Sequence, residues 1–173
     1  METSKKNYIK SYIEAVAAFA ALLVIDQLTK WLAVVHLKDK APFILIDGVF
    51  QFRYLENRGA AFGMMQDRQY IFVAGAVIIC LIIAFLYVRI PHEKKYLPLK
   101  ICGVLLCAGA IGNMIDRIRL NYVIDFLYFN LIDFPIFNVA DCYVVISCIV
   151  FVILVLFYYK DENDFAFLNY KKK

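Results

Sequence analysis

The sequence predicts an all-α integral membrane protein with four transmembrane helices and a small β insertion outside the membrane. Its 173 residues are 63% apolar and have a mean hydropathy of +0.67, whereas soluble proteins are roughly 45–50% apolar. An uncharged run at 70–88 is long enough to cross a bilayer. Polar side chains gather instead at 109–141. We therefore expect one membrane domain, 1–173, in which this polar stretch carries the function.

The four helices are predicted in order along the chain. The apolar core of the first, at 15–25, is too short to span alone, since a crossing takes roughly 20 residues. This helix, about 11–37, must therefore include Asp26 and Lys30, which lie one turn apart on one face. The other segments are helix two at about 70–88, an inner basic loop at 89–100, helix three at about 99–117, helix four at about 138–159 and an inner tail at 160–173.

Two segments outside the helices have β character. The first is an outer insertion at about 38–68, where Asp47-Gly48 suits a two-residue hairpin turn. Phe50, Phe52 and Tyr54 then alternate onto one face of the hairpin. Because so small a sheet is marginally stable in water, we expect it to rest on the bilayer or on a helix. We hypothesise that its aromatic face lies on lipid as a movable clamp. The second segment, an outer loop at 118–137, predicts a second short hairpin or an extended loop.

The basic residues predict the topology. The first ten residues, the 89–100 loop and the tail hold 11 of the 19 Lys and Arg, and Lys and Arg favour the cytoplasmic side. Both termini are therefore expected in the cytoplasm. The net charge of +4 is then a topology signal, and we expect no nucleic-acid partner. No cleavage site follows the polar N-terminus, which we expect to be retained. The five cysteines lack metal-site spacing and suggest no disulfide framework.

The polar stretch at 109–141 contains four carboxylates: Asp116, Asp125, Asp133 and Asp141. Asp125 and Asp141 are too far apart in sequence to meet on one helix, but they meet if the outer loop folds back over the last span. Two carboxylates held together share a proton, because both cannot easily ionise. Such a pair suits amide hydrolysis, with one member activating water and the other protonating the carbonyl.

The residues alone also allow plainer readings. Asp125 and Asp141 fit loop or helix-cap positions, Asp133 fits a turn, and Asp116 fits an interfacial charge pair with Arg117. Intramembrane polar residues also line the paths of transporters and proton relays, or serve helix packing in a non-catalytic scaffold. The internal repeats and broken helices of transporters are not visible in the sequence. His36 and His92 are single, and we assign them no role.

Four blocks together resemble the bacterial lipoprotein signal peptidase family, signal peptidase II. They are DQLTK at 26–30, NRGAAFG at 57–63, GAIGNMIDR through VIDF at 109–126, and FNVAD at 137–141. Their order and spacing relative to the predicted helices match the family along nearly the whole chain. One departure is Phe134, where family members often carry Trp; an aromatic ring is kept.

The resemblance implies an integral membrane aspartic endopeptidase of the bacterial inner membrane. Such an enzyme removes signal peptides from prolipoproteins by cutting before a cysteine that already carries diacylglyceryl. It implies Asp125 and Asp141 as the catalytic pair, with no cofactor or metal. It also implies four helices, an extracytoplasmic β-cradle and a short amphipathic helix. Prolipoproteins and membrane lipids are the expected partners, and we expect a monomer. The supporting or substrate-binding residues that it implies are Asn57, Gly109, Asn113, Arg117, Asn138, Asp26 and Lys30.

Overall fold

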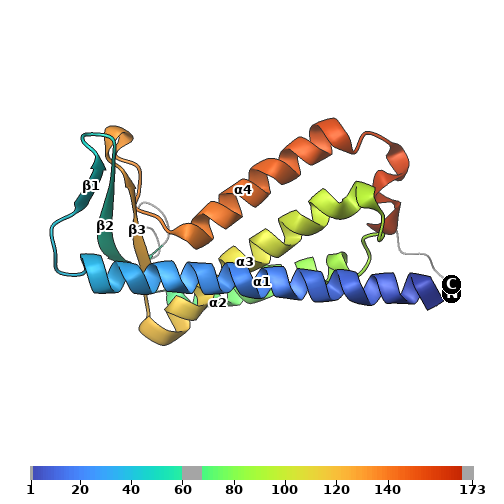
Figure 1. Cartoon of the computed structure of the whole chain (residues 1–173), viewed down its shortest axis with the longest axis horizontal. Coiled ribbons are helices and arrows are strands. Elements are labelled where there is room, and N and C mark those ends of the chain that lie inside the picture. Colours follow the sequence, from blue (N-terminus) through green and yellow to red (C-terminus); the bar gives the residue numbers. More distant parts are fainter. Residues whose placement is uncertain (1, 60–67, 169–173) are drawn as a thin grey trace.

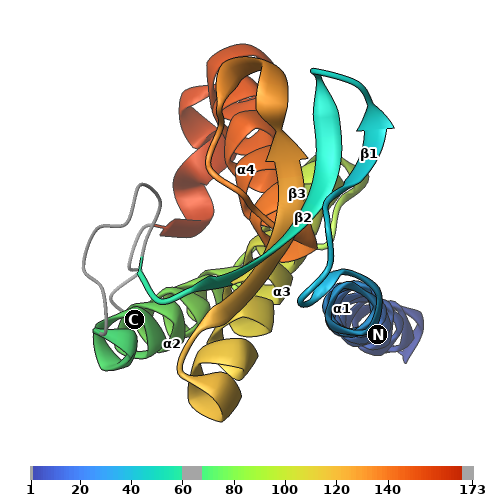
Figure 2. The same ribbon diagram turned by 90° about the vertical axis from the view of Figure 1, so that its left-hand side faces the viewer.

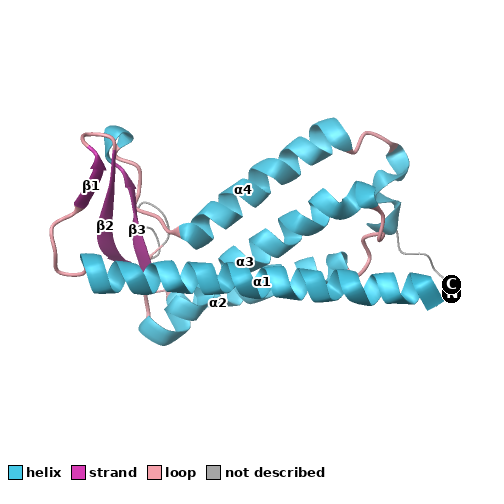
Figure 3. Cartoon of the chain, viewed as in Figure 1, coloured by secondary structure: helices cyan, strands magenta, loops and turns pink. Residues whose placement is uncertain are grey.

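The computed structural model describes residues 2–59 and 68–168, and within these ranges four helices are long and apolar enough to cross a membrane. Figures 1 and 3 show the helices side by side, with a small sheet at one end. The predicted four-helix fold is confirmed. The helices are α1 (Glu2–Leu37), α2 (Gln69–Tyr87), α3 (Leu97–Leu120) and α4 (Val139–Ile153), the last extended by one π-helical turn, η4 (Leu154–Tyr158).

Two helices are longer than their apolar runs predicted. α1 begins at Glu2 instead of about residue 11, because polar residues continue a helix beyond the apolar run as long as water can solvate them. α3 continues to Leu120 instead of 117. It ends at Asn121, which has φ of 61° and donates its N–H to the Arg117 carbonyl. Asn tolerates this left-handed conformation and so caps the helix, whereas the charges at 116–117 do not stop it.

Helix α3 lies between the other three helices and contacts each of them. Its glycines permit the closest of these approaches. A Cβ on Gly109 would lie 2.5 Å from the Ala140 carbonyl oxygen of α4, and one on Gly112 would lie 2.5 Å from the Asp26 carboxylate of α1. Larger residues would therefore push both neighbouring helices away.

The sheet has the strand order β1 (Phe43–Ile46), β2 (Phe50–Asn57) and β3 (Val123–Phe129), and both pairs are antiparallel. The predicted hairpin at Asp47-Gly48 is confirmed, but three residues rather than two separate its strands. The Val49 N–H donates to the Ile46 carbonyl, and Gly48 has φ of 69°. This left-handed conformation explains the glycine.

Of the two alternatives predicted for 118–137, a second short hairpin and an extended loop, a separate hairpin does not form. The first half of this segment forms β3, which pairs with the free edge of β2 and so extends the first hairpin into one sheet. The second half forms a single turn, η3 (Asn130–Ile132), and returns with one isolated bridge between Phe137 and Leu127. Pro135 lacks an N–H, which limits further strand pairing here.

The sheet rests on the helix ends, as expected, and Figure 2 shows it across that end of the bundle. Ile124 and Phe126 of β3 form a buried cluster with Ala33 of α1, and Phe52 and Tyr54 pack against this cluster. These two aromatic rings are therefore partly buried against protein, and the movable clamp over lipid stays a prediction.

Beside the sheet, the one-turn helix η3 has Leu131 and Ile132 both exposed. At three residues it is too short to be the amphipathic helix that the family resemblance implies. The segment 60–67 of the outer insertion lies outside the described residues.

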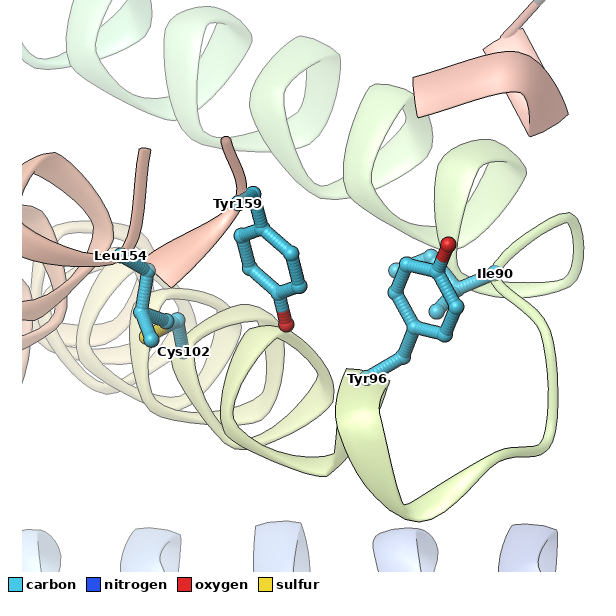
Figure 4. Packing of buried hydrophobic residues seen from close by; sticks show 5 residues of the cluster. All are labelled: Ile90, Tyr96, Cys102, Leu154 and Tyr159. Atoms are coloured by element: carbon cyan, nitrogen blue, oxygen red, sulfur yellow. The ribbon is translucent and has the colours of Figure 1, made fainter. Parts of the chain in front are cut away.

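A second core closes the opposite end of the bundle. Tyr96 stacks on Tyr159 with ring centroids 5.7 Å apart, and both lie in one cluster with Ile90, Cys102 and Leu154 (Figure 4). Figure 1 shows the start of α1 and the α2–α3 connection at this end, away from the sheet. Two of the basic segments that set the predicted topology therefore lie at the same end.

Candidate active site

Asp125 and Asp141 are brought to one pocket, as the sequence predicted. Asp125 lies in the middle of β3 and Asp141 in the first turn of α4, so sheet and helix each contribute one carboxylate. Both line a cavity of about 1000 Å³ beneath the sheet, at the ends of α3 and α4. Asp125 is 1% exposed. The cavity walls therefore hold this carboxylate away from bulk water.

Asn138 joins the two carboxylates. It is the N-cap of α4, and it forms a capping box with Asp141, in which each side chain accepts the backbone N–H of the other residue. Its backbone N–H lies 3.0 Å from Asp141 Oδ2, while its side-chain amide donates to Asp125 Oδ1 at 2.6 Å. One residue at the start of a helix thus fixes the position of both acids.

Two further amides complete the hydrogen bonding of the pair. Asn57 on β2 donates to Asp125 Oδ2 at 2.8 Å, and Asn113 on α3 donates to Asp141 Oδ1 at 2.8 Å. Every oxygen of the two carboxylates therefore has a donor. Burial raises the pKa of Asp125, and the nearby charge of Asp141 raises it further, to about 7. Asp125 is thus poised to gain or lose a proton near neutral pH.

Asp26 and Lys30 lie behind this pair and touch it through Asn113. The Lys30 ammonium contacts Asp26 Oδ2 and Asp116 Oδ2 at 3.0 Å each, and donates to Asn113 Oδ1 at 2.9 Å. Its side chain is 2% exposed. Asp26 Oδ1 also accepts the Ala140 N–H at 3.0 Å, which holds the start of α4 against α1. These two residues support the site rather than line the cavity.

The expected charge pair between Asp116 and Arg117 is wrong. Asp116 is 3% exposed and pairs with Lys30, and it also accepts the Ile124 N–H at 3.2 Å. Gln27, which we had not singled out, donates to Asp116 Oδ1 at 3.1 Å. Neighbouring residues on a helix point in different directions. That spacing alone argues against a pair between Asp116 and Arg117.

Arg117 lines the cavity with its guanidinium among carbonyls. It donates to the Gly59 carbonyl at 3.4 Å and to the Asn113 carbonyl at 3.5 Å, and it lies 4.6 Å from the Phe72 ring centroid. Asp133 occupies a turn with φ of 48°, as predicted, and accepts the Tyr128 hydroxyl at 2.5 Å. Within the described ranges no group of three His, Cys, Asp or Glu residues is placed to hold a metal ion.

Comparisons with known proteins identify the family of this chain. The family model described as signal peptidase (SPase) II matches residues 18–157. The chain belongs to the signal peptidase II family. A lipoprotein signal peptidase of Streptococcus thermophilus is 39% identical over 84% of the chain and 92% of the relative, and one of Caldanaerobacter subterraneus is 36% identical over 83% and 96%. A solved structure described as a bacterial membrane enzyme is 29% identical with a TM-score of 0.75, over 86% of this chain and 92% of that one.

Signal peptidase II membership makes this multi-pass membrane protein a protease, and its cavity fits the expected aspartic class. Among the supporting residues carried over from the family, the three asparagines bond the acids and Arg117 lines the cavity. Asp26 and Lys30 lie behind Asn113, and Gly109 serves the α3–α4 contact.

Part of the cavity wall was missed by sequence reasoning. The missed residues are Cys142, Val145 and Ile146 of α4, whereas Phe134 and Phe137, which line the cavity from the segment before the helix, were noted with the family blocks. Spacing held a partial signal, since residues one turn apart share a helix face. Which face of α4 meets the cavity depends on its packing against α3, and this the sequence does not give.

Proposed function

We propose that this signal peptidase II removes signal peptides from diacylglyceryl-modified prolipoproteins, cutting before the lipidated cysteine with a water activated by Asp125 and Asp141. One observation carries the proposal: a buried carboxylate, Asp125, and a half-buried one, Asp141, come from different elements, face one cavity and are joined through Asn138. The capping box explains the bonds between Asp141 and Asn138, but it does not explain why Asn138 also bonds Asp125 at the same cavity.

The raised pKa of Asp125 suggests the division of labour. Near neutral pH Asp125 carries a proton in much of the population, so it acts as the acid, and ionised Asp141 acts as the base. Water between them gives a proton to Asp141 as its oxygen attacks the scissile carbonyl carbon. Asp125 gives its proton to the carbonyl oxygen, which leaves a neutral tetrahedral diol.

Breakdown of the diol returns both groups to their starting states. Asp141 passes its proton to the amide nitrogen as the carbon–nitrogen bond breaks. One diol hydroxyl returns its proton to Asp125 as the new carboxylic acid forms. The two side chains exchange roles as acid and base, and every proton is accounted for without a cofactor.

The three asparagines hold this geometry without taking part in proton transfer. Asn57, Asn113 and Asn138 direct amide N–H groups at the carboxylates, and an amide keeps its protonation state at every working pH. Arg117 is positioned to bind a main-chain carbonyl of the substrate, because its guanidinium already bonds carbonyl oxygens at the cavity wall. Lys30 and Asp26 fix Asn113 and the start of α4.

The shape of the cavity fits a substrate that lies partly in lipid. Its polar end holds the acids, whereas its α4 side is apolar at Val145 and Ile146. A signal-peptide helix and its acyl chains occupy hydrocarbon, while the scissile bond reaches the membrane surface. From the Lys and Arg distribution, we infer that the active site faces outward from a bacterial inner membrane and that the termini are cytoplasmic. We expect a monomer, because one chain supplies both acids.

The test is cleavage of a diacylglyceryl-modified prolipoprotein by the purified, detergent-solubilised protein. We expect cleavage by the wild type and none by Asp125→Asn or Asp141→Asn. Asp47→Asn is the matched control, because Asp47 is an exposed turn residue and asparagine also suits that turn. Cleavage that survives both cavity substitutions would remove the acid pair from the mechanism. Failure of the folded wild type to cleave would contradict the proposed substrate.

A further inference from the structure

At the end of the bundle away from the sheet, a cluster of polar and aromatic side chains is left unused by peptide cleavage. We call it the inner cluster; its members are Tyr8 and Tyr12 of α1, Tyr87 of α2, His92 of the α2–α3 connection and Lys100 of α3. The His92 ring centroid lies 4.3 Å from that of Tyr8 and 5.2 Å from that of Tyr12. The Lys100 ammonium lies 5.6 Å from the Tyr87 ring centroid. Four chain segments thus converge on one place.

Lys100 is a largely buried lysine that has no acidic partner in the part of the chain that the structure describes. It is 5% exposed, and among the described residues no carboxylate lies within ion-pair distance of it. Lys30, the other buried lysine, has two. The exposed acid Glu14 faces Lys10 at 3.7 Å instead. Burying an ammonium is costly unless a counter-charge offsets the lost hydration. The inner cluster therefore favours an anion.

The side chains around Lys100 contribute neutral hydrogen-bond donors and no negative charge. Burial lowers the pKa of His92, and the charge of Lys100 lowers it further, so the imidazole is neutral at pH 7 and keeps one N–H. The Tyr12 and Tyr87 rings are 6.1 Å apart, and each carries a hydroxyl able to donate. A positive charge surrounded by neutral donors is the arrangement that binds a phosphate group.

The depth of the inner cluster indicates the source of the phosphate. α2 ends at Tyr87 and α3 begins at Leu97, so the cluster lies where the helices leave the membrane, at head-group depth. Beside it on α1, Ile9 and Ile13 are 58% and 63% exposed and offer apolar surface for acyl chains. We propose that Lys100, His92 and Tyr12 bind the phosphate of an anionic phospholipid from the leaflet at this end of the bundle.

The test is lipid binding by the full-length protein, measured by native mass spectrometry after delipidation. Phosphatidylglycerol is titrated into the wild type, Lys100→Met, Tyr12→Phe and Lys94→Met. Lys94 is the matched control, because it is exposed on the neighbouring connection. Methionine fills the same apolar volume as the lysine stem, and prolipoprotein cleavage checks that each variant is folded.

We expect Lys100→Met to bind phosphatidylglycerol about tenfold more weakly, the factor that corresponds to roughly 1.4 kcal/mol. Tyr12→Phe should show a smaller loss, and Lys94→Met should match the wild type. Zwitterionic phosphatidylcholine should bind more weakly, and millimolar inorganic phosphate should not displace the lipid. Equal affinity in wild type and Lys100→Met would overturn the site. Displacement by inorganic phosphate would overturn its assignment to lipid.

Discussion

The buried lysine behind the acid pair gives the sharpest stability prediction. Lys30→Met removes an ammonium that lies 3.0 Å from each of two buried carboxylates, Asp26 and Asp116. Breaking such a buried pair costs about 3–5 kcal/mol, because the remaining charges stay desolvated and unpaired. For a chain of this size that lowers the Tm by roughly 6–20 °C. Activity should fall as well, because the Asn113 amide oxygen loses one of its two donors and keeps only the Asn138 amide.

A thiol-reactive dye measures this unfolding in detergent, because unfolding exposes buried cysteines such as Cys102. Lys38→Met is the matched control: Lys38 lies 3.0 Å from Glu56, but its side chain is 40% exposed, so little change is expected. The double variant Lys30→Met with Asp116→Asn should regain part of the loss, since one unpaired charge is removed. A Lys30→Met protein that melts within a few degrees of the wild type would refute this reasoning.

Two further predictions concern helix contact and proton linkage. Gly109→Ala should lower stability by about 1–3 kcal/mol, and lower activity as well, because the new Cβ forces α3 away from the Ala140 carbonyl. Gly75→Ala is the control: nothing lies within 4 Å of its new Cβ, so the change should be neutral or slightly stabilising. Equal effects of the two substitutions in a thermal melt would contradict the close contact at Gly109. The raised pKa of Asp125 means that the folded state binds more protons than the unfolded state between pH 4 and 7, so wild-type stability falls as pH rises through that window. Asp125→Asn lacks this dependence, so its free energy of unfolding relative to wild type should increase by about 2 kcal/mol from pH 5 to 7 and then level off. If denaturant titrations give the same difference between variant and wild type at every pH, the raised pKa is contradicted.

Local signals were enough to predict most of the fold. Length and hydropathy identify helix α2, and Asp47-Gly48 identifies the hairpin. The continuation of α1 through Asp26 and Lys30 follows from the minimum length of a span. Helix ends were less predictable, since Asn121 stops α3 by its backbone conformation and not by a change in polarity.

Contacts between residues distant in sequence could not be predicted from the residue pattern alone. The pairing of β3 with β2 depends on which strand edge is free after the chain has folded, and composition does not encode this. Asp116 was assigned to its sequence neighbour, whereas its cation comes from α1. The resemblance to a known family selected Asp125 and Asp141 from four candidates. Only the structure, through Asn138, gives a physical reason for that choice.

The pH dependence of kcat/KM for prolipoprotein cleavage tests the acid pair most directly. If Asp125 must be protonated, activity falls as pH rises through its pKa of about 7. The Asn57 amide stabilises ionised Asp125 and so lowers that pKa. We predict that Asn57→Ala moves the alkaline fall in activity to higher pH. A fall that stays in place, moves to lower pH or is absent from the wild type would contradict the assignment of Asp125 as the proton donor.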